Sequence, residues 1–202
     1  LMGFIIGALV AFSIIVWRIR AKTREAEAFH AFYRASEILI SAEDPSSKGY
    51  QEALDEFERV QREYPRTDAA ELAQLQLGQG LLKLKQYDKA METYRKFLDS
   101  NPGQKLHRLF AYQNLGYAYE GLEDYQKALD SFQELVDMGE SFLQPWGYLN
   151  LARCYEKLGR RDEVLKNYRI FLEKFPDSIM VPMVKSKTGA LEGSSNNPAP
   201  AK

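Results

Sequence analysis

The stretch LAQLQLGQGLLKLKQYDKAMETYRKFLDSNP, residues 72–102, is the key to the architecture because related stretches follow it twice along the chain. The later copies are LFAYQNLGYAYEGLEDYQKALDSFQELVDMG at 109–139 and PWGYLNLARCYEKLGRRDEVLKNYRIFLEKFP at 145–176. In each copy a small residue is followed twelve positions later by a small or branched one, and then, four positions on, by an aromatic one. The three sets are Gly78, Ala90, Tyr94; Gly116, Ala128, Phe132; and Ala152, Val164, Tyr168. Self-similarity with a period of roughly 20–50 residues indicates a repeat protein.

A weaker copy precedes these three, with Ala53, Phe57 and Pro65 at the same relative spacings. Measured between equivalent positions, the period is 37, 38 and 36 residues. Apolar residues within a copy recur at steps of three and four, which predicts two helices with one apolar face each. Because no segment alternates with a period of two, we predict an all-α protein.

Two glycines and three prolines support this interpretation. Gly78 and Gly116 lie inside helical patterns, where glycine costs about 1 kcal/mol relative to alanine. We therefore expect another helix to approach closely at both positions. Pro65, Pro102 and Pro176 stand where the second helices should end, because proline cannot continue a helix.

The spacing of small residues, aromatics and closing prolines resembles the tetratricopeptide repeat (TPR). The resemblance covers residues 29–178 and implies an all-α TPR solenoid of helix–turn–helix repeats. The expected segments are a transmembrane helix at 1–19, an irregular first repeat at 25–65 with a long loop at 42–49, repeats at 68–103, 106–140 and 144–178, a capping segment at 179–192 and a disordered tail at 193–202.

The transmembrane helix is predicted from an uncharged apolar run, residues 1–17. As a helix this run spans about 26 Å, close to the ~30 Å hydrocarbon core of a bilayer. Trp17 and the basic residues that follow it, Arg18, Arg20, Lys22 and Arg24, are typical of an interfacial edge. A cleaved signal peptide is the alternative, but it requires a basic start and small residues before the cleavage point. The first residue is Leu1, so we expect further residues upstream.

Composition argues against several classes of function. Lys+Arg and Asp+Glu total 27 and 28, so the chain lacks the basic excess of a nucleic-acid-binding protein. His30 and His107 are isolated, which argues against a metal site. Cys154, the single cysteine, lies on an apolar helical side and is expected to be buried. The glycines of 78–80 follow no strand and lack the lysine of a phosphate loop. We expect no catalytic residue, cofactor or small-molecule substrate, and hence no enzyme.

Stacked first helices of TPR proteins form a concave surface that binds other proteins, and the resemblance implies the same surface here. The positions expected to line this groove are Leu75, Gln79, Leu82, Phe110, Gln113, Tyr117, Trp146, Leu149 and Arg153. Aromatic residues and arginine are common anchors of protein interfaces. The alternative is that neighbouring repeats or the C-terminal segment cover some of these side chains.

An N-terminal apolar segment followed by about four repeats resembles the bacterial ancillary translocon subunit family. That resemblance implies a single-pass inner-membrane protein with periplasmic repeats, acting as a scaffold or chaperone-like adaptor at a membrane complex such as the secretion translocon. The basic residues after the apolar run, taken alone, would instead favour cytoplasmic repeats. Two alternatives stay open. Residues 62–70 and 173–180 resemble repeat ends of the outer-membrane assembly lipoproteins, although no lipobox cysteine follows the apolar run. The second alternative is a structural subunit of a larger membrane complex.

Overall fold

The computed structural model describes residues 2–42, 44–100, 103–139 and 142–195, with the side chains of 2–6, 8, 194 and 195 excluded. The described residues form nine helices and no strand, which confirms the predicted all-α, TPR-like solenoid. The helices are α1 Met2–Ser41, α2 Lys48–Glu63, α3 Asp68–Lys83, α4 Tyr87–Asp99, α5 Lys105–Gly121, α6 Tyr125–Asp137, α7 Gln144–Lys157, α8 Arg161–Lys174 and α9 Val181–Ser195.

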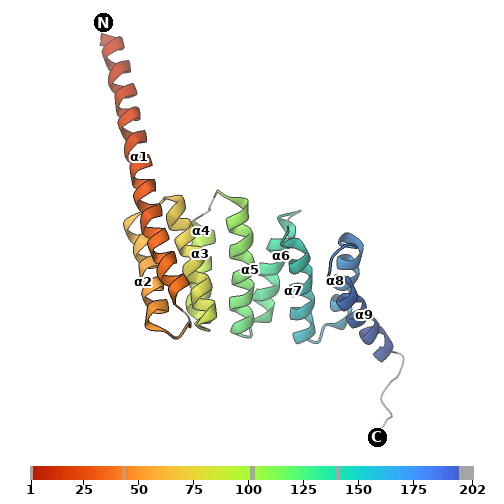
Figure 1. Ribbon diagram of the computed structural model, residues 1–202. Helices are drawn as coiled ribbons and strands as arrows, with labels where there is room; N and C mark the ends of the chain where they lie inside the picture. The colour runs from red at the N-terminus through yellow and green to blue at the C-terminus, as the bar shows by residue number, and fades with distance from the viewer. Residues whose placement is uncertain (1, 43, 101–102, 140–141, 196–202) are drawn as a thin grey trace.

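The helices stand side by side in one row and alternate in direction (Figure 1). Each helix from α2 to α8 packs against the one before it and the one after it, and α9 packs against α8 at the C-terminal end of the row. First helices of neighbouring repeats also touch, α1 with α3 and α3 with α5. Because successive helices alternate in direction, the first helices α3, α5 and α7 all begin at one edge of the solenoid and end at the other.

Local chemistry explains where these helices begin and end. The side chains of Ser47, Thr67 and Asp124 accept hydrogen bonds from the backbone amides of the first turns of α2, α3 and α6, which would otherwise lack partners. α2 and α8 end just before Pro65 and Pro176, as predicted. Pro102 and Glu140, at the corresponding places in the other repeats, lie outside the described residues.

The core is built from the repeated aromatic residues of the second helices. Phe57, Tyr94 and Phe132 are fully buried, and burial raises the pKa of the Tyr94 phenol. A Cβ atom added at Gly78 would stand 2.5 Å from Cζ of Tyr94, and one added at Gly116 would overlap the ring of Phe132. The predicted close approach at both glycines is therefore confirmed.

α1 has two parts. From Ala28 onward its small and aromatic side chains enter the core, whereas its N-terminal part projects beyond the solenoid (Figure 1). Two contacts hold the helix where it leaves the row. Nη2 of Arg24 donates to the backbone carbonyl of Glu63 at 3.1 Å, and Oε1 of Glu25 accepts from the backbone amide of Ala69 at 3.2 Å. The direction of α1 is thus tied to the junction between α2 and α3.

The predicted transmembrane helix at 1–19 is not supported. Among the residues that the structure describes, no helix is long and apolar enough to cross a membrane. Leu1, and the side chains of 2–6 and 8, lie outside the described residues.

The C-terminal end is helical for longer than expected. α9 continues to Ser195 and so includes the first residues of the tail predicted at 193–202, while 196–202 lie outside the described residues. Val184 anchors this helix, since its side chain is fully buried in the main hydrophobic cluster.

Candidate functional site

The groove residues predicted from the sequence lie on α3, α5 and α7, the first helices of three successive repeats (Figure 1). None of them is buried: Leu75, Leu82, Phe110, Gln113, Tyr117 and Leu149 are half-buried, and Gln79, Trp146 and Arg153 are exposed. The three leucines and Tyr117 also pack against the main hydrophobic core with part of their surface. This face is therefore an accessible surface built on rigid helices.

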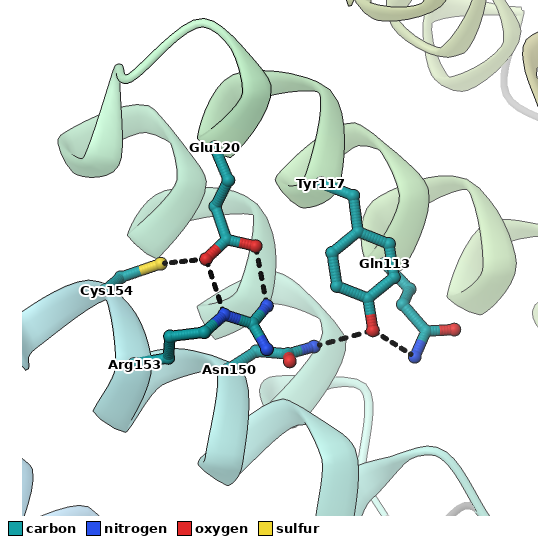
Figure 2. Close-up of polar contacts among 6 residues, drawn as sticks. All are labelled: Gln113, Tyr117, Glu120, Asn150, Arg153 and Cys154. Carbon is teal, nitrogen blue, oxygen red and sulfur yellow. Dashed lines mark hydrogen bonds and ion pairs between the residues drawn. The ribbon is translucent and has the colours of Figure 1, made fainter. Parts of the chain in front are cut away.

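Tyr117 is held between α5 and α7 by hydrogen bonds at its hydroxyl (Figure 2). The hydroxyl oxygen accepts from Nδ2 of Asn150 and from Nε2 of Gln113, each at 3.3 Å. Its ring meets the buried ring of Phe132 edge-on, with centroids 5.6 Å apart. Because Asn150 is itself buried, the phenol is fixed from both helices.

Arg153 is fixed next to Tyr117 by a two-pronged ion pair with Glu120 (Figure 2). Its Nε and Nη2 donate to Oε1 and Oε2 of Glu120 at 2.8 and 2.6 Å. This hydrogen-bonded carboxylate raises the pKa of Arg153 above its ordinary value, against the effect of burial. The guanidinium carbon lies 5.7 Å from the centroid of the Tyr117 ring, a cation–π distance. Arg153 and Tyr117 thus form one ordered unit.

Cys154 lies next to this unit, and its environment favours the protonated thiol. It is fully buried, as expected, and its Sγ donates to Oε1 of Glu120 at 3.4 Å. Burial first, and the negative charge of Glu120 second, raise the pKa of the Cys154 thiol far above its ordinary value. The thiolate is the nucleophilic form, so the geometry here opposes a reactive cysteine.

An open hollow of about 530 Å³ adjoins the Tyr117–Arg153 unit. Three predicted groove residues border it, together with two further tyrosines, two lysines, one glutamate and one glycine: Leu82, Tyr117, Arg153, Tyr87, Tyr125, Lys83, Lys157, Glu120 and Gly121. This end of the groove therefore combines aromatic surface with positive charge.

The other end of the groove is aromatic and lies near the start of the first helices. The ring of Phe110 meets that of Phe142 edge-on, with centroids 5.9 Å apart. Trp146, in the first turn of α7, follows Phe142 by four residues and has 46% of its surface exposed. Tyr117 lies about two helical turns further along α5 than Phe110. The structure thus separates the predicted aromatics into two places on the groove.

Sequence reasoning missed Glu120 and Asn150, which hold Arg153 and Tyr117 in place. Glu120 and Arg153 are 33 residues apart, close to one repeat period. An acidic and a basic residue separated by nearly one period are a usable signal, but only once the relative offset of α5 and α7 is known.

The two histidines lie on different helices, His30 on α1 and His107 on α5. Within the described part of the chain no group of three or more histidine, cysteine, aspartate or glutamate side chains could hold a metal ion. His107 is buried, with Nδ1 3.2 Å from Oε2 of Glu71, and links the first turns of α5 and α3.

Comparison with known proteins identifies the family. The family model YfiO, described as an outer membrane lipoprotein, matches residues 30–187. The chain belongs to this YfiO family. The match begins within α1 and ends within α9, so it covers α2 to α8 in full. The resemblance to the ancillary translocon subunits is not confirmed.

More distant similarities agree on the fold. The human intraflagellar transport protein 88 homolog is 29% identical over 121 residues, which cover 59% of this chain but only 14% of that protein. A TPR protein from Parabacteroides merdae superposes with a TM-score of 0.65 at 14% identity, over 86% of this chain and 62% of that one. The MamA RS-1 double mutant superposes with a TM-score of 0.63 at 17% identity, over 82% and 84% of the two chains. At these identities the structures share the TPR-like solenoid.

Proposed function

We propose that this YfiO-family chain is a protein-binding scaffold that holds a partner on the groove formed by α3, α5 and α7. The observation that carries the proposal is the ordered pair Tyr117 and Arg153. Both side chains are accessible, and each is hydrogen-bonded to a neighbouring helix: Tyr117 accepts from Asn150, and Arg153 donates to Glu120. Prearranged side chains lose less conformational entropy on binding, and tyrosine and arginine are frequent anchors of protein interfaces.

The hydrogen bonds at Tyr117 suggest what the partner supplies. A tyrosine hydroxyl has two acceptor positions and one donor. Asn150 and Gln113 both donate to its oxygen, which leaves the O–H to donate outward. A backbone carbonyl of a peptide segment is a suitable acceptor. Arg153 keeps further N–H groups beyond the two bonded to Glu120, so the unit is suited to a segment of extended chain.

The binding test uses single substitutions with a matched control. Partners are first identified by affinity purification in mild detergent, and binding of the purified partner is then measured. Tyr117→Ala and Arg153→Gln should each weaken binding by roughly ten- to thirtyfold while the protein keeps most of its thermal stability. Tyr33→Ala, which removes an exposed tyrosine of α1 outside the groove, should leave the affinity unchanged.

Two results would contradict the groove proposal. If both variants melt much earlier than the wild type, Tyr117 and Arg153 serve the packing of the solenoid and not a binding surface. If both are stable and bind normally, the partner occupies another face of the solenoid.

The proposal includes attachment to a membrane of a bacterial cell envelope, with the repeats on the periplasmic side. Two observations support it: the family description names an outer membrane lipoprotein, and the projecting part of α1 carries exposed large apolar side chains between Leu9 and Trp17. From Leu9 to Trp17 no side chain is charged and the large apolar ones are mostly exposed, and a helical segment that is apolar all round needs an apolar environment. Association with a membrane complex such as the secretion translocon is the finer form of this proposal.

The family match favours a second candidate role, in assembly at the outer membrane. Cell fractionation separates the two roles, because the translocon role requires the chain in inner-membrane fractions and the assembly role requires it in outer-membrane fractions. Sidedness is read from Ser186→Cys on the exposed surface of α9, since native Cys154 is buried. Labelling by an impermeant maleimide in spheroplasts supports periplasmic repeats, and labelling only after lysis would contradict them.

A further inference from the structure

Exposed apolar side chains of the solenoid gather at one edge. Beyond residue 24, apart from Tyr33 and Ile40 of α1, the exposed large hydrophobic residues in the described ranges lie in the loops or first turns at the starts of α5, α7 and α9. They are Leu106, Phe142, Trp146, Ile179 and Met183, with 44, 64, 46, 96 and 46% of their surface exposed. We refer to these five residues as the apolar edge.

The apolar edge is the edge from which α1 projects (Figure 1). Helices alternate in direction, so α1 and all later first helices start on this side. The opposite edge carries the turns within repeats, where polar and charged residues such as Lys85, Glu123 and Arg160 are exposed. The two edges therefore differ in chemistry, and the apolar one shares its side with the projecting helix.

The relation between α1 and this edge is fixed by specific contacts. Arg24 and Glu25 bond to the backbone at the end of α2 and the start of α3, both of which lie at the same edge. Ala28 and Phe32 then bury the following turns of α1 in the core. α1 therefore leaves the solenoid in a fixed direction. A surface that binds the apolar N-terminal part of α1 also faces this edge.

We propose that the apolar edge rests on the lipid surface into which the N-terminal part of α1 inserts, an inference that depends on the membrane attachment proposed above. The five side chains come from the starts of three helices along the row. Such a spaced series suits a lipid interface, whereas protein hot spots cluster at the centre of a packed patch. Trp146 is also the residue type that prefers the level of lipid headgroups. The row of helices then runs along the membrane, and the groove opens parallel to the surface.

The test uses tryptophan fluorescence, because the chain has only two tryptophans, Trp17 and Trp146. W17F leaves Trp146 as the reporter of the edge, and W146F leaves Trp17 as the reporter of α1. Each full-length variant is mixed with phosphatidylcholine–phosphatidylglycerol vesicles whose acyl chains carry bromine, a contact quencher. A third variant, W17F/W146F/I40W, carries its tryptophan on the opposite edge at Ile40, an apolar position that is more exposed than Trp146, at 83% against 46%. Circular dichroism checks that all three are folded.

We expect the emission of Trp146 in W17F to fall at least twofold in brominated vesicles relative to unbrominated ones. The emission of the tryptophan at position 40 in W17F/W146F/I40W should stay unchanged. Quenching of W146F without quenching of W17F would overturn the edge proposal and leave the attachment of α1 standing. No quenching in any variant would overturn the attachment and the edge proposal together. Equal quenching of W17F and W17F/W146F/I40W would show non-specific adsorption and overturn the edge proposal. Shielding of Trp146 by a partner protein but not by vesicles would make the edge a protein interface instead.

Discussion

Gly116→Ala tests the packing on which the solenoid depends. The added Cβ would overlap the fully buried ring of Phe132 and stand 2.8 Å from its Cδ1, against ~3.5–4.0 Å for an ordinary carbon–carbon contact. Overpacking of this kind costs about 1–3 kcal/mol. Alanine in place of glycine within a helix stabilises it by about 1 kcal/mol, so the net decrease in the free energy of unfolding should be up to about 2 kcal/mol.

Gly189→Ala is the matched control, because Gly189 is also helical but a Cβ there meets nothing within 4 Å. The helix-propensity gain is common to both variants, so their difference in unfolding free energy isolates the overpacking cost of about 1–3 kcal/mol. For a chain of this size the difference corresponds to roughly 2–12 °C in Tm.

Urea unfolding of the full chain in mild detergent, followed by circular dichroism, provides the measurement. A second variant, Gly116→Ala/Phe132→Leu, replaces the ring with a smaller side chain. Its destabilisation should be at least ~1 kcal/mol smaller than the sum of the two single changes, because residues in contact couple. If Gly116→Ala is as stable as Gly189→Ala, or if the two changes are additive, the contact between Gly116 and Phe132 does not limit the packing.

Three further predictions concern the thiol, a helix contact and the N-terminal segment. Because burial raises the pKa of Cys154, the folded protein keeps a proton that the unfolded chain releases near pH 8.5. The contribution of this thiol to the free energy of unfolding should therefore be fully present below that pH and fall by about 1.4 kcal/mol per pH unit above it. Urea titrations from pH 8 to 10 on the wild type and Cys154→Ala should show a flatter dependence of stability on pH in the variant. Glu25→Ala leaves the buried amide of Ala69 without its acceptor and should cost about 1–3 kcal/mol, whereas the exposed Glu27→Ala should stay within about 0.5 kcal/mol in the same unfolding assay. Removal of residues 1–17 should leave a helical domain that melts cooperatively, since the core residues of α1 begin at Ala28, and a non-cooperative melt would refute this independence.

The architecture was predictable because contacts in a solenoid are made between neighbouring repeats. Gly116 must admit the ring of Phe132 sixteen residues later in the same repeat, and the same requirement recurs at Gly78 and Tyr94. Packing that repeats in space leaves a period in the sequence, so the helices, the close approaches and the exposed groove positions follow from spacing. α1 was harder to interpret, because a run of apolar residues indicates an apolar environment without indicating whether a helix crosses it or lies against it.

The candidate site was predictable only in part. Spacing from the small packing residues indicated that Tyr117 and Arg153 face outward, since that depends on position around a single helix. Their partners Asn150 and Glu120 belong to a neighbouring first helix, and such pairing depends on the rotation and offset between α5 and α7. A contact that occurs between only one pair of repeats produces no recurring pattern in the sequence.

The amino-acid sequence by itself determined that this protein is an all-α stack of TPR-like repeats with an apolar N-terminal segment, because those properties arise from the local period of side chains along each helix. Only the tertiary structure decided that Tyr117 and Arg153 are held as one unit, and that Leu106, Phe142, Trp146, Ile179 and Met183 share the edge from which α1 projects. Both depend on how whole helices are placed beside one another, and that placement sums many contacts across the core that no single stretch of sequence contains.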